Sequence, residues 1–348
     1  EKKDWKSLAR FYEEEFKKWG FNVVIYANHL LRASYKAMQD VGKIILQNER
    51  SLESEPYIAK VKEIFEKVGF MDIKQKDKEL SDIPAVIIPA AGENPELKNF
   101  LRGIPKPLYK LGGKNILEHN ISLFNKFSID EINVIIGYQK DRFSYLNGIN
   151  LIENNDYQTT GILHSLMLAK DKMKKGFVYL NADTLVDERL LKELLERKED
   201  IVIAVDNSFK YHKHHVDKKL DGVITKKGSN ILHMGLRHVD DEAVMVGRNI
   251  SEENMTHEFI GMMKFSKYGA ENLIKIYEDC LANHKGRFHE AESFAKSHET
   301  DILQELIKRG FKVSIHETNG GWIEIVNEKD FENAKELLKD FEISAEAN

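Results

Sequence analysis

The sequence is poor in cysteine, because Cys280 is the only one among 348 residues. A single cysteine excludes a disulfide framework or a thiolate metal cluster within one chain, and it suits a reducing compartment. Long apolar runs are also missing, since no stretch approaches the roughly 20 residues that cross a bilayer. The N-terminal residues Glu1–Asp4 lack a signal-peptide pattern, and the missing initiator methionine suggests a processed chain or a piece of a longer one. We therefore expect a cytoplasmic protein without a membrane partner.

An excess of positive charge is missing as well. The formal net charge is -5 at pH 7, and lysines alternate with glutamates along the predicted helices. This pattern is typical of solvated helix faces and disfavours a nucleic-acid partner. With 42% hydrophobic residues, the chain can bury a sizeable core and has the length of one large domain plus an appendage.

The first 70 residues or so have the apolar spacing of helices. We predict helices near residues 5–12, 30–46 and 57–68, and one short strand at 21–26 that would need partners to pair with. The charged stretch 74–79 is typical of a linker.

From residue 83 onward the pattern changes to alternating strands and helices. The expected strands are 85–89, 132–136, 177–181, 201–205, 222–226, 258–265, 312–316 and 321–326. The expected helices are 115–127, 161–173, 187–196, 269–282, 299–309 and 329–340. This alternation predicts a doubly wound α/β sheet with some antiparallel strands near its edge.

A nucleotide-binding entrance is the most informative local pattern. The apolar run 85–88 has the branching of a central strand, and small residues after it let a triphosphate approach the backbone. Lys106 follows between Pro105 and Pro107, which limit its local freedom and suit a cation that meets a phosphate reproducibly. An exposed loop lysine is the alternative.

Two carboxylates are candidates for a metal site. Asp183 ends the apolar strand 177–181, where open α/β sheets bind ligands, and a helix N-cap is the less favoured alternative. Glu324, within the strand 321–326, could share a hard cation with it, or be an ordinary strand glutamate facing solvent.

Two family resemblances are carried by these motifs. Residues 22–35, continuing to 49–51, resemble the C-terminal end of phosphoenolpyruvate mutase. The resemblance covers roughly residues 18–70 and implies that the mutase active site lies on barrel strands that would precede residue 1. It makes residues 1–80 a helical C-terminal part of a mutase domain plus linker, with the mutase domain on the same polypeptide in the full-length protein.

Residues 81–348 resemble nucleotidyltransferases with a GT-A-like fold, within them the phosphocholine and phosphonate cytidylyltransferase branch. The anchors are Ala90–Gly92, Pro105–Leu108, Gly113–Glu118, Ile135–Tyr138, Asn181–Asp183, Glu258–Gly261 and Trp322–Ile325. The resemblance implies an α/β fold with a mixed, mostly parallel sheet. It also implies CTP as a substrate, an anionic acceptor and Mg²⁺ as the cofactor.

The resemblance assigns roles to residues of this sequence. Lys106 is the implied catalytic cation near the α-phosphate, and Asp183 and Glu324 are the implied Mg²⁺ ligands. The expected nucleotide-binding residues are Pro89, Ala90, Ala91, Gly92, Lys98, Arg102, Gly137, Tyr138, Thr160 and Ser165. The expected acceptor-binding residues are Glu258, Gly261, Tyr211 and Trp322.

The sequence departs from the family pattern at several positions. Asn94 stands where a second glycine is usual, and Glu96 stands where an arginine is usual. Gly161 and Ile162 replace paired asparagines near the base, and Val326 replaces an aspartate, for which Asn327 is a candidate substitute.

Some acceptor contacts stay open. The histidine-rich segment 210–215 could grip a phosphonate, but an exposed loop is the favoured interpretation. A positively charged aminoethyl group would be bound by carboxylates, for which Glu258, Asp240 and Asp241 are candidates.

The hypothesis is a cytidylyltransferase that activates a phosphonate, above all 2-aminoethylphosphonate, as its CMP conjugate. The mutase-like segment suggests this acceptor, because the mutase makes a carbon–phosphorus bond. The alternatives are phosphocholine or a sugar 1-phosphate as acceptor, and a nucleotide-binding module without turnover. A homo-oligomer is a further expectation.

Overall fold

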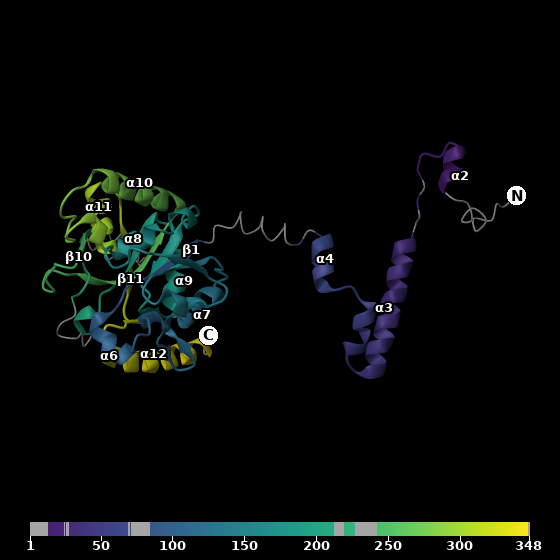
Figure 1. The fold of residues 1–348 in the computed structure, drawn as a ribbon, viewed down its shortest axis with the longest axis horizontal. Helices are drawn as coiled ribbons and strands as arrows, with labels where there is room; N and C mark the ends of the chain where they lie inside the picture. The colour runs from purple at the N-terminus through teal and green to yellow at the C-terminus, as the bar shows by residue number, and fades with distance from the viewer. Residues whose placement is uncertain are drawn as a thin grey trace, which may run out of the picture. The chain divides into compact units, whose positions relative to one another are not determined.

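The computed structural model describes residues 13–23, 25, 28–68, 70, 84–211, 219–226 and 242–346. The chain divides into two compact units, Glu1–Ser81 and Asp82–Asn348 (Figure 1). In these described ranges, no helix has both the length and the apolar character needed to cross a bilayer.

The first unit is helical where it is described. It contains α2 (Glu13–Lys18), α3 (His29–Asn48), the 3₁₀-helix η1 (Leu52–Tyr57) and α4 (Val61–Lys67). The predicted helices at 30–46 and 57–68 are thus present, whereas the one near 5–12 lies outside the described residues. Residues 21–23 and 25 do not form the expected strand, and residues 24 and 26 are not described. No side chain of α2, α3 or α4 is buried.

The second unit is built around a nine-stranded sheet. Its strands are β1 (Ala85–Ala90), β4 (Ile132–Ile136), β5 (Asn150–Glu153), β6 (Phe177–Leu180), β8 (Ile201–Asp206), β9 (Gly222–Thr225), β10 (Ala243–Gly247), β11 (His257–Phe265) and β12 (Ser314–Thr318). Along its main path the order is β10-β9-β11-β6-β1-β4-β5, and β8 pairs with β11 and β12.

The pairings make the sheet mixed but mostly parallel. β1 lies parallel to both β4 and β6, β4 to β5, and β8 to β12. β11 runs antiparallel to β6, β8 and β9, and β10 runs antiparallel to β9. All strands except β10 and β11 therefore point the same way, which confirms the predicted fold class. β10 lies at an edge as expected, but the antiparallel β11 lies inside the sheet, between β6 and the strands β8 and β9.

Helices cover both faces of this sheet, because apolar side chains alternate along its central strands. Val86 and Ile88 of β1 face a core shared with α7 (Ile116–Lys126) and α9 (Glu188–Glu196). Ile87 faces the opposite core, which α8 (Ile162–Met167), α10 (Lys267–Asn283) and α11 (Glu299–Lys308) close (Figure 1).

Smaller elements complete the unit. They are α6 (Lys98–Leu101), a hairpin of β2 (Lys110–Leu111) and β3 (Lys114–Asn115), a ribbon of β7 (Thr184–Val186) and β13 (Trp322–Glu324), and α12 (Glu328–Glu346). Every strand and helix expected after residue 83 has a counterpart at similar bounds, but α8 is shorter than the expected 161–173. β5, β7 and β10 were not among the expected strands.

Candidate active site

A cavity of about 360 Å³ opens where β1 and β6 end, the edge at which open α/β sheets bind ligands. Its lining comes from segments far apart in the sequence. The residues that line it are Pro89, Ala90, Ala91, Gly92, Asn94, Lys106, Pro107, Tyr157, Thr160, Gly161, Ile162, Ser165, Asn181, Ala182, Asp183, Asp221, Arg248, His298, Glu299 and Glu324.

Lys106 and Asp183 form an ion pair in the wall of this cavity. The Lys106 Nζ lies 2.6 Å from Asp183 Oδ2 and donates a hydrogen bond to the carbonyl of Ile325 at 2.9 Å. Burial alone would lower the pKa of Lys106, but Asp183 and then Glu324 and Glu96 outweigh it and raise that pKa. Lys106, which is only 7% exposed, is therefore a fixed cation rather than an exposed loop lysine.

The β7–β13 ribbon brings Glu324 next to Asp183. In its register Glu324 pairs with Thr184, the residue after Asp183, and the Ile325 N–H donates to the Asp183 carbonyl at 2.9 Å. Asp183 does not cap a helix, because α9 is capped by Asp187, whose side chain accepts from the Leu190 N–H. The two expected metal ligands thus lie together, 141 residues apart in sequence, since 324 − 183 = 141.

The loop after β1 supplies backbone rather than charge. Pro89 to Gly92 line the cavity, and Gly92 is exposed with open space where a Cβ would be. Glu96 is exposed and is not among the lining residues, although its charge acts on Lys106.

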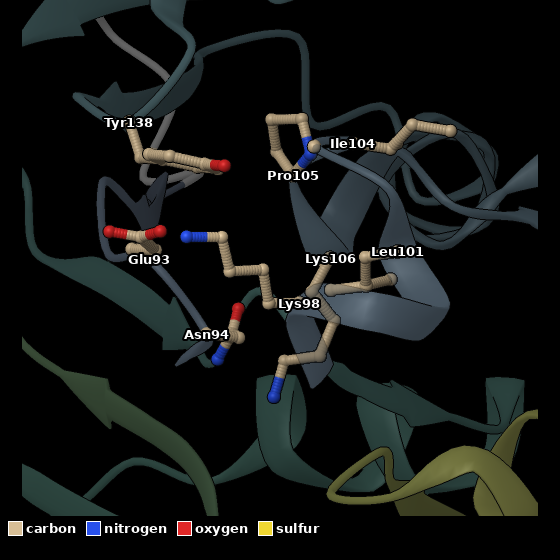
Figure 2. Close-up of a pocket in the computed structure, with 9 residues that line it drawn as sticks. Glu93, Asn94, Lys98, Leu101, Ile104, Pro105, Lys106 and Tyr138 are labelled. Carbon is tan, nitrogen blue, oxygen red and sulfur yellow. The ribbon is translucent and has the colours of Figure 1, made fainter. Parts of the chain in front are cut away.

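Two expected phosphate contacts lie elsewhere. Lys98 lines a small adjoining cleft, where Figure 2 shows its side chain extending toward Glu93 and Tyr138 while Lys106 extends away from them. Arg102 is exposed in a left-handed conformation at the end of α6 and lines neither space.

A buried asparagine connects the expected base-binding residues. Asn154 Nδ2 donates to the Ser165 hydroxyl at 2.9 Å and to the Thr160 hydroxyl at 3.2 Å. Thr160 donates to the Asp156 carbonyl, and Gly161, not Thr160, is the N-cap of α8. Sequence reasoning missed Asn154, which carries no motif of its own.

Close backbone approach explains two glycines. A Cβ on Gly137 would come within 2.8 Å of the Tyr157 ring and of the Ala91 carbonyl, so Gly137 lets this ring pack against the end of β4. A Cβ on Gly161 would lie 2.3 Å from the Ser297 carbonyl. The Gly161 N–H donates to the Ala295 carbonyl at 2.7 Å, which ties the segment before α8 to the one before α11.

None of the four expected acceptor-binding residues lines the cavity. Glu258 is buried in β11, and the indole of Trp322 is buried with its Nε1 donating to Asp206 at 2.5 Å. Tyr211 is 88% exposed. Gly261 acts indirectly, because its φ of +74° and missing Cβ leave room for the side chain of the cavity residue Asn181. Residues 212–215, and also Asp240 and Asp241, lie outside the described residues.

Asn327, considered above as a substitute metal ligand, instead stabilises the start of a helix. Its Oδ1 accepts from the Lys329 N–H at 2.9 Å at the start of α12, and the Asp330 carboxylate accepts from the N–H groups of Val326 and Asn327.

The cavity wall also contains residues that sequence reasoning missed: Asp221, Arg248, His298 and Glu299. Arg248 Nη1 lies 3.3 Å from His298 Nε2, and Arg248 Nε lies 3.4 Å from Asp221 Oδ1. Burial, helped by Arg248, lowers the pKa of His298 and favours its neutral form. Burial raises the pKa of Glu299 to about 7, and Glu324 and Asp183 add to that rise.

The donor set beside Lys106 fits a divalent cation of the magnesium type. Mg²⁺ is commonly held by one or two carboxylates, with water and substrate phosphates completing its shell. Asp183 and Glu324 provide two such carboxylates on the cavity wall, and no cluster of three histidine, cysteine or acidic side chains suited to a metal occurs in the described residues.

A family model matches part of the chain. The model of the MobA-like NTP transferase domain matches residues 86–245. These residues are similar to that domain, and they make up less than half of the chain. The match begins in β1 and covers Lys106 and Asp183, whereas Arg248, Glu299 and Glu324 lie beyond it.

Curated relatives match separate parts of the chain. A phosphoenolpyruvate phosphomutase of Tetrahymena pyriformis is 46% identical over 65 residues, which is 19% of this chain and 22% of the relative. A choline-phosphate cytidylyltransferase of Streptococcus pneumoniae is 30% identical over 114 residues, or 32% and 49% of the two chains. A 2-aminoethylphosphonate cytidylyltransferase of Lancefieldella rimae is 28% identical over 107 residues, or 29% and 44%.

This chain thus spans between about a fifth and a half of the length of these curated relatives. Its fold also matches a solved structure of the CTP:phosphocholine cytidylyltransferase from Streptococcus pneumoniae, with a TM-score of 0.56 and 18% identity. That alignment covers 73% of this chain and 98% of the other, so the second unit has the fold of that structure.

Proposed function

We propose that the chain is a CTP:phosphonate cytidylyltransferase, which transfers CMP to a phosphonate such as 2-aminoethylphosphonate and releases pyrophosphate. The observation that carries the proposal is the buried Lys106–Asp183 pair with Glu324 beside it, at the edge of a cavity that begins at a loop of small residues. The similarity to cytidylyltransferases that act on choline phosphate and on 2-aminoethylphosphonate supports this reaction class.

The proposed reaction needs positioning more than acid–base chemistry. An ionised phosphonate oxygen attacks the α-phosphorus of CTP and forms the new P–O bond. The bond between the α-phosphorus and the bridging oxygen to the β-phosphorus breaks, and pyrophosphate leaves with that electron pair. Both substrates are anions, so the site must align them and neutralise the charge that develops between them.

Each residue of the proposed site then has a physical task. Lys106, fixed by Asp183 and by the Ile325 carbonyl, presents a permanent positive charge to the α-phosphate. Asp183 and Glu324 would hold a magnesium ion, which when bound supplies further positive charge to the phosphates. Thr160 and Ser165, connected through Asn154, present hydroxyl groups to the base and ribose end of the nucleotide.

The first unit supports a phosphonate as the acceptor. We propose that it is the C-terminal part of a phosphoenolpyruvate mutase domain, on the basis of the 65-residue similarity. A mutase that makes a carbon–phosphorus bond would supply phosphonates to a transferase on the same polypeptide. Phosphocholine remains the alternative acceptor, because a choline-phosphate cytidylyltransferase is among the relatives.

Pyrophosphate release with Mg²⁺ and each of the four nucleoside triphosphates tests the reaction. We expect turnover with CTP and 2-aminoethylphosphonate, and none in the Asp183→Asn variant with its fold retained by circular dichroism. CTP binding without turnover of a phosphonate, phosphocholine or a sugar 1-phosphate would instead favour a nucleotide-binding module.

A further inference from the structure

One carboxylate of the cavity wall has no use in the reaction described so far. Glu299 is the first residue of α11, is 5% exposed, and lines the cavity. Its Oε2 is buried and accepts no hydrogen bond from the described residues, although its own backbone N–H interacts with the carboxyl group. A buried polar atom without a partner is costly, so an oxygen in a cavity wall is suited to a donor that a ligand brings.

The charges around Glu299 indicate the sign of that ligand. Arg248 lies against Asp221 and His298, and His298 is favoured in its neutral form. Asp221 and Glu299 thus place two carboxylates in the part of the wall that holds Arg248. Asp183 and Glu324 are two further carboxylates of the same wall, beside Lys106, and they act electrostatically on Glu299. A wall with four carboxylates is suited to a ligand that brings a positive charge.

We propose that Glu299, supported by Asp221 and Arg248, determines acceptor specificity by binding the primary ammonium group of a short aminoalkyl phosphonate. This inference rests on the proposed function and deepens it. The phosphonate group would lie at the Lys106 side, where the reaction occurs, while the amine lies at the Glu299 side. Both sides belong to one cavity of about 360 Å³.

The chemistry of the wall favours a primary ammonium over two related head groups. A primary ammonium donates up to three hydrogen bonds and carries a charge, so it satisfies Glu299 in both respects. A hydroxyl group donates one hydrogen bond and leaves the charge unpaired. A trimethylammonium has no N–H, and proteins usually bind it with several aromatic faces.

Aromatic faces are scarce in this wall. Among the described residues that line the cavity, the only ring other than the His298 imidazole is that of Tyr157, which packs against Gly137. Trp322 and Tyr211, two of the expected acceptor-binding residues, are not among the lining residues, so Tyr157 would be the single aromatic face of the described wall for a choline-like acceptor. The described wall therefore fits an amine better than a choline head group.

The test compares acceptors in the full-length chain and its Glu299→Gln variant. Glutamine keeps the shape and removes the charge. We expect the native chain to use 2-aminoethylphosphonate at least about tenfold more efficiently than 2-hydroxyethylphosphonate or phosphocholine, measured as kcat/KM. In Glu299→Gln the KM for 2-aminoethylphosphonate should rise by roughly 10- to 100-fold, so the ratio of kcat/KM between 2-aminoethylphosphonate and 2-hydroxyethylphosphonate should fall by at least about tenfold.

Two further variants test whether a change in the ratio between acceptors is specific to the cavity carboxylates. Glu305→Gln alters another buried glutamate of α11 that lies outside the cavity and pairs with Arg309 and His289, so it should leave the ratio between acceptors unchanged. Asp221→Asn should reduce the same ratio as Glu299→Gln and provides a second test if Glu299→Gln does not fold.

Two results would overturn the inference. One is an unchanged ratio between acceptors in both cavity variants. The other is a native chain that uses 2-hydroxyethylphosphonate or phosphocholine as well as the amine. Either result leaves the proposed cytidylyl transfer standing, because turnover itself continues. Absence of turnover with every acceptor would contradict the proposed function instead.

Discussion

Lys106 is held from two directions, by Asp183 after β6 and by the carbonyl of Ile325 after β13. Its position depends on Pro105, which precedes the short 3₁₀ turn Lys106–Leu108, and on Pro107, which lies within that turn. A long and flexible side chain is thereby ordered before substrate arrives, and the site avoids the entropy cost of ordering it during binding.

At the residue scale, we predict that Lys106→Ala lowers kcat for cytidylyl transfer by about 10²- to 10³-fold, because a fixed positive charge near the α-phosphate is lost. Lys98→Ala, in the adjoining cleft, should change kcat by less than about tenfold. Initial rates of pyrophosphate release measure both variants. Equal losses in the two would contradict the assignment of Lys106 as the principal cation.

Glu299 also predicts a pH dependence of stability. Its pKa is raised from 4.5 to about 7, with Asp183, Asp221, Arg248, His298 and Glu324 around it in the cavity wall. The folded state therefore holds a proton that the unfolded state releases between these two values, and stability falls as pH rises from about 4.5 to 7. Without ligand, Glu299→Gln should be more stable than the native chain above pH 7, by up to about 3 kcal/mol.

Urea unfolding at pH 5 and pH 8 measures this difference. The advantage of Glu299→Gln should be small at pH 5 and larger at pH 8. The same advantage at both pH values would show that packing, and not charge, distinguishes the two side chains.

The predictability of single residues follows from their local context. Lys106 stands between two prolines, and Asp183 follows a buried apolar strand. Both features can be recognised in the sequence. Arg248 and Glu299 stand in segments without such a mark, and tertiary structure alone brings them to the cavity. Trp322 shows the reverse case, since an aromatic residue in a functional motif is used to pack the core and bind Asp206.

At the scale of elements, the junction between the segments before α8 and α11 holds the nucleotide side and the acceptor side together. Gly161 is central to this junction, because its N–H donates to Ala295 and its missing side chain admits the Ser297 carbonyl. A side chain added at Gly161 would push these two segments apart and so displace the cavity residues that follow them in α8 and α11.

We therefore predict that Gly161→Ala weakens CTP binding by at least about tenfold and lowers stability by about 1–3 kcal/mol, since a Cβ would overlap the Ser297 carbonyl. Gly113→Ala is the matched control, because nothing lies within 4 Å of its added Cβ and its φ is not positive. Isothermal titration with CTP and thermal unfolding measure both. Normal CTP affinity in Gly161→Ala would contradict the proposed coupling.

The main strands and helices are predictable from the sequence because their apolar runs are long. β1 and β8 are buried along their whole length, and such runs have a clear signal. β5 is short and mostly exposed, so it shows no continuous apolar run. β10 has an apolar run at residues 243–246, but the run is short and two of its side chains are exposed. The pairing of β7 with β13, which aligns the two carboxylates, is a long-range contact that no local pattern indicates.

At the scale of the whole molecule, the two units differ in how they are stabilised. The second unit has extensive cores on both faces of its sheet. In the described part of the first unit, α3 exposes large apolar side chains such as Leu30, Leu31 and Met38. A helix with an uncovered apolar face gains little from packing.

From this difference we predict that residues 82–348 alone fold and retain kcat within about twofold of the full chain. Residues 1–81 alone should show weak helical circular dichroism and a broad thermal transition, because an isolated helix is marginal in water. Loss of activity in the 82–348 fragment, despite a native-like spectrum, would mean that the helical unit contributes to the site.

The measurement that tests the central claim most directly is pyrophosphate release by the full chain with Mg²⁺ and CTP, in parallel with four acceptors. These are 2-aminoethylphosphonate, 2-hydroxyethylphosphonate, phosphocholine and glucose 1-phosphate. The account predicts selective turnover of 2-aminoethylphosphonate. Preference for phosphocholine or glucose 1-phosphate would contradict the phosphonate assignment, and CTP binding without any turnover would contradict the proposal that the chain is a cytidylyltransferase.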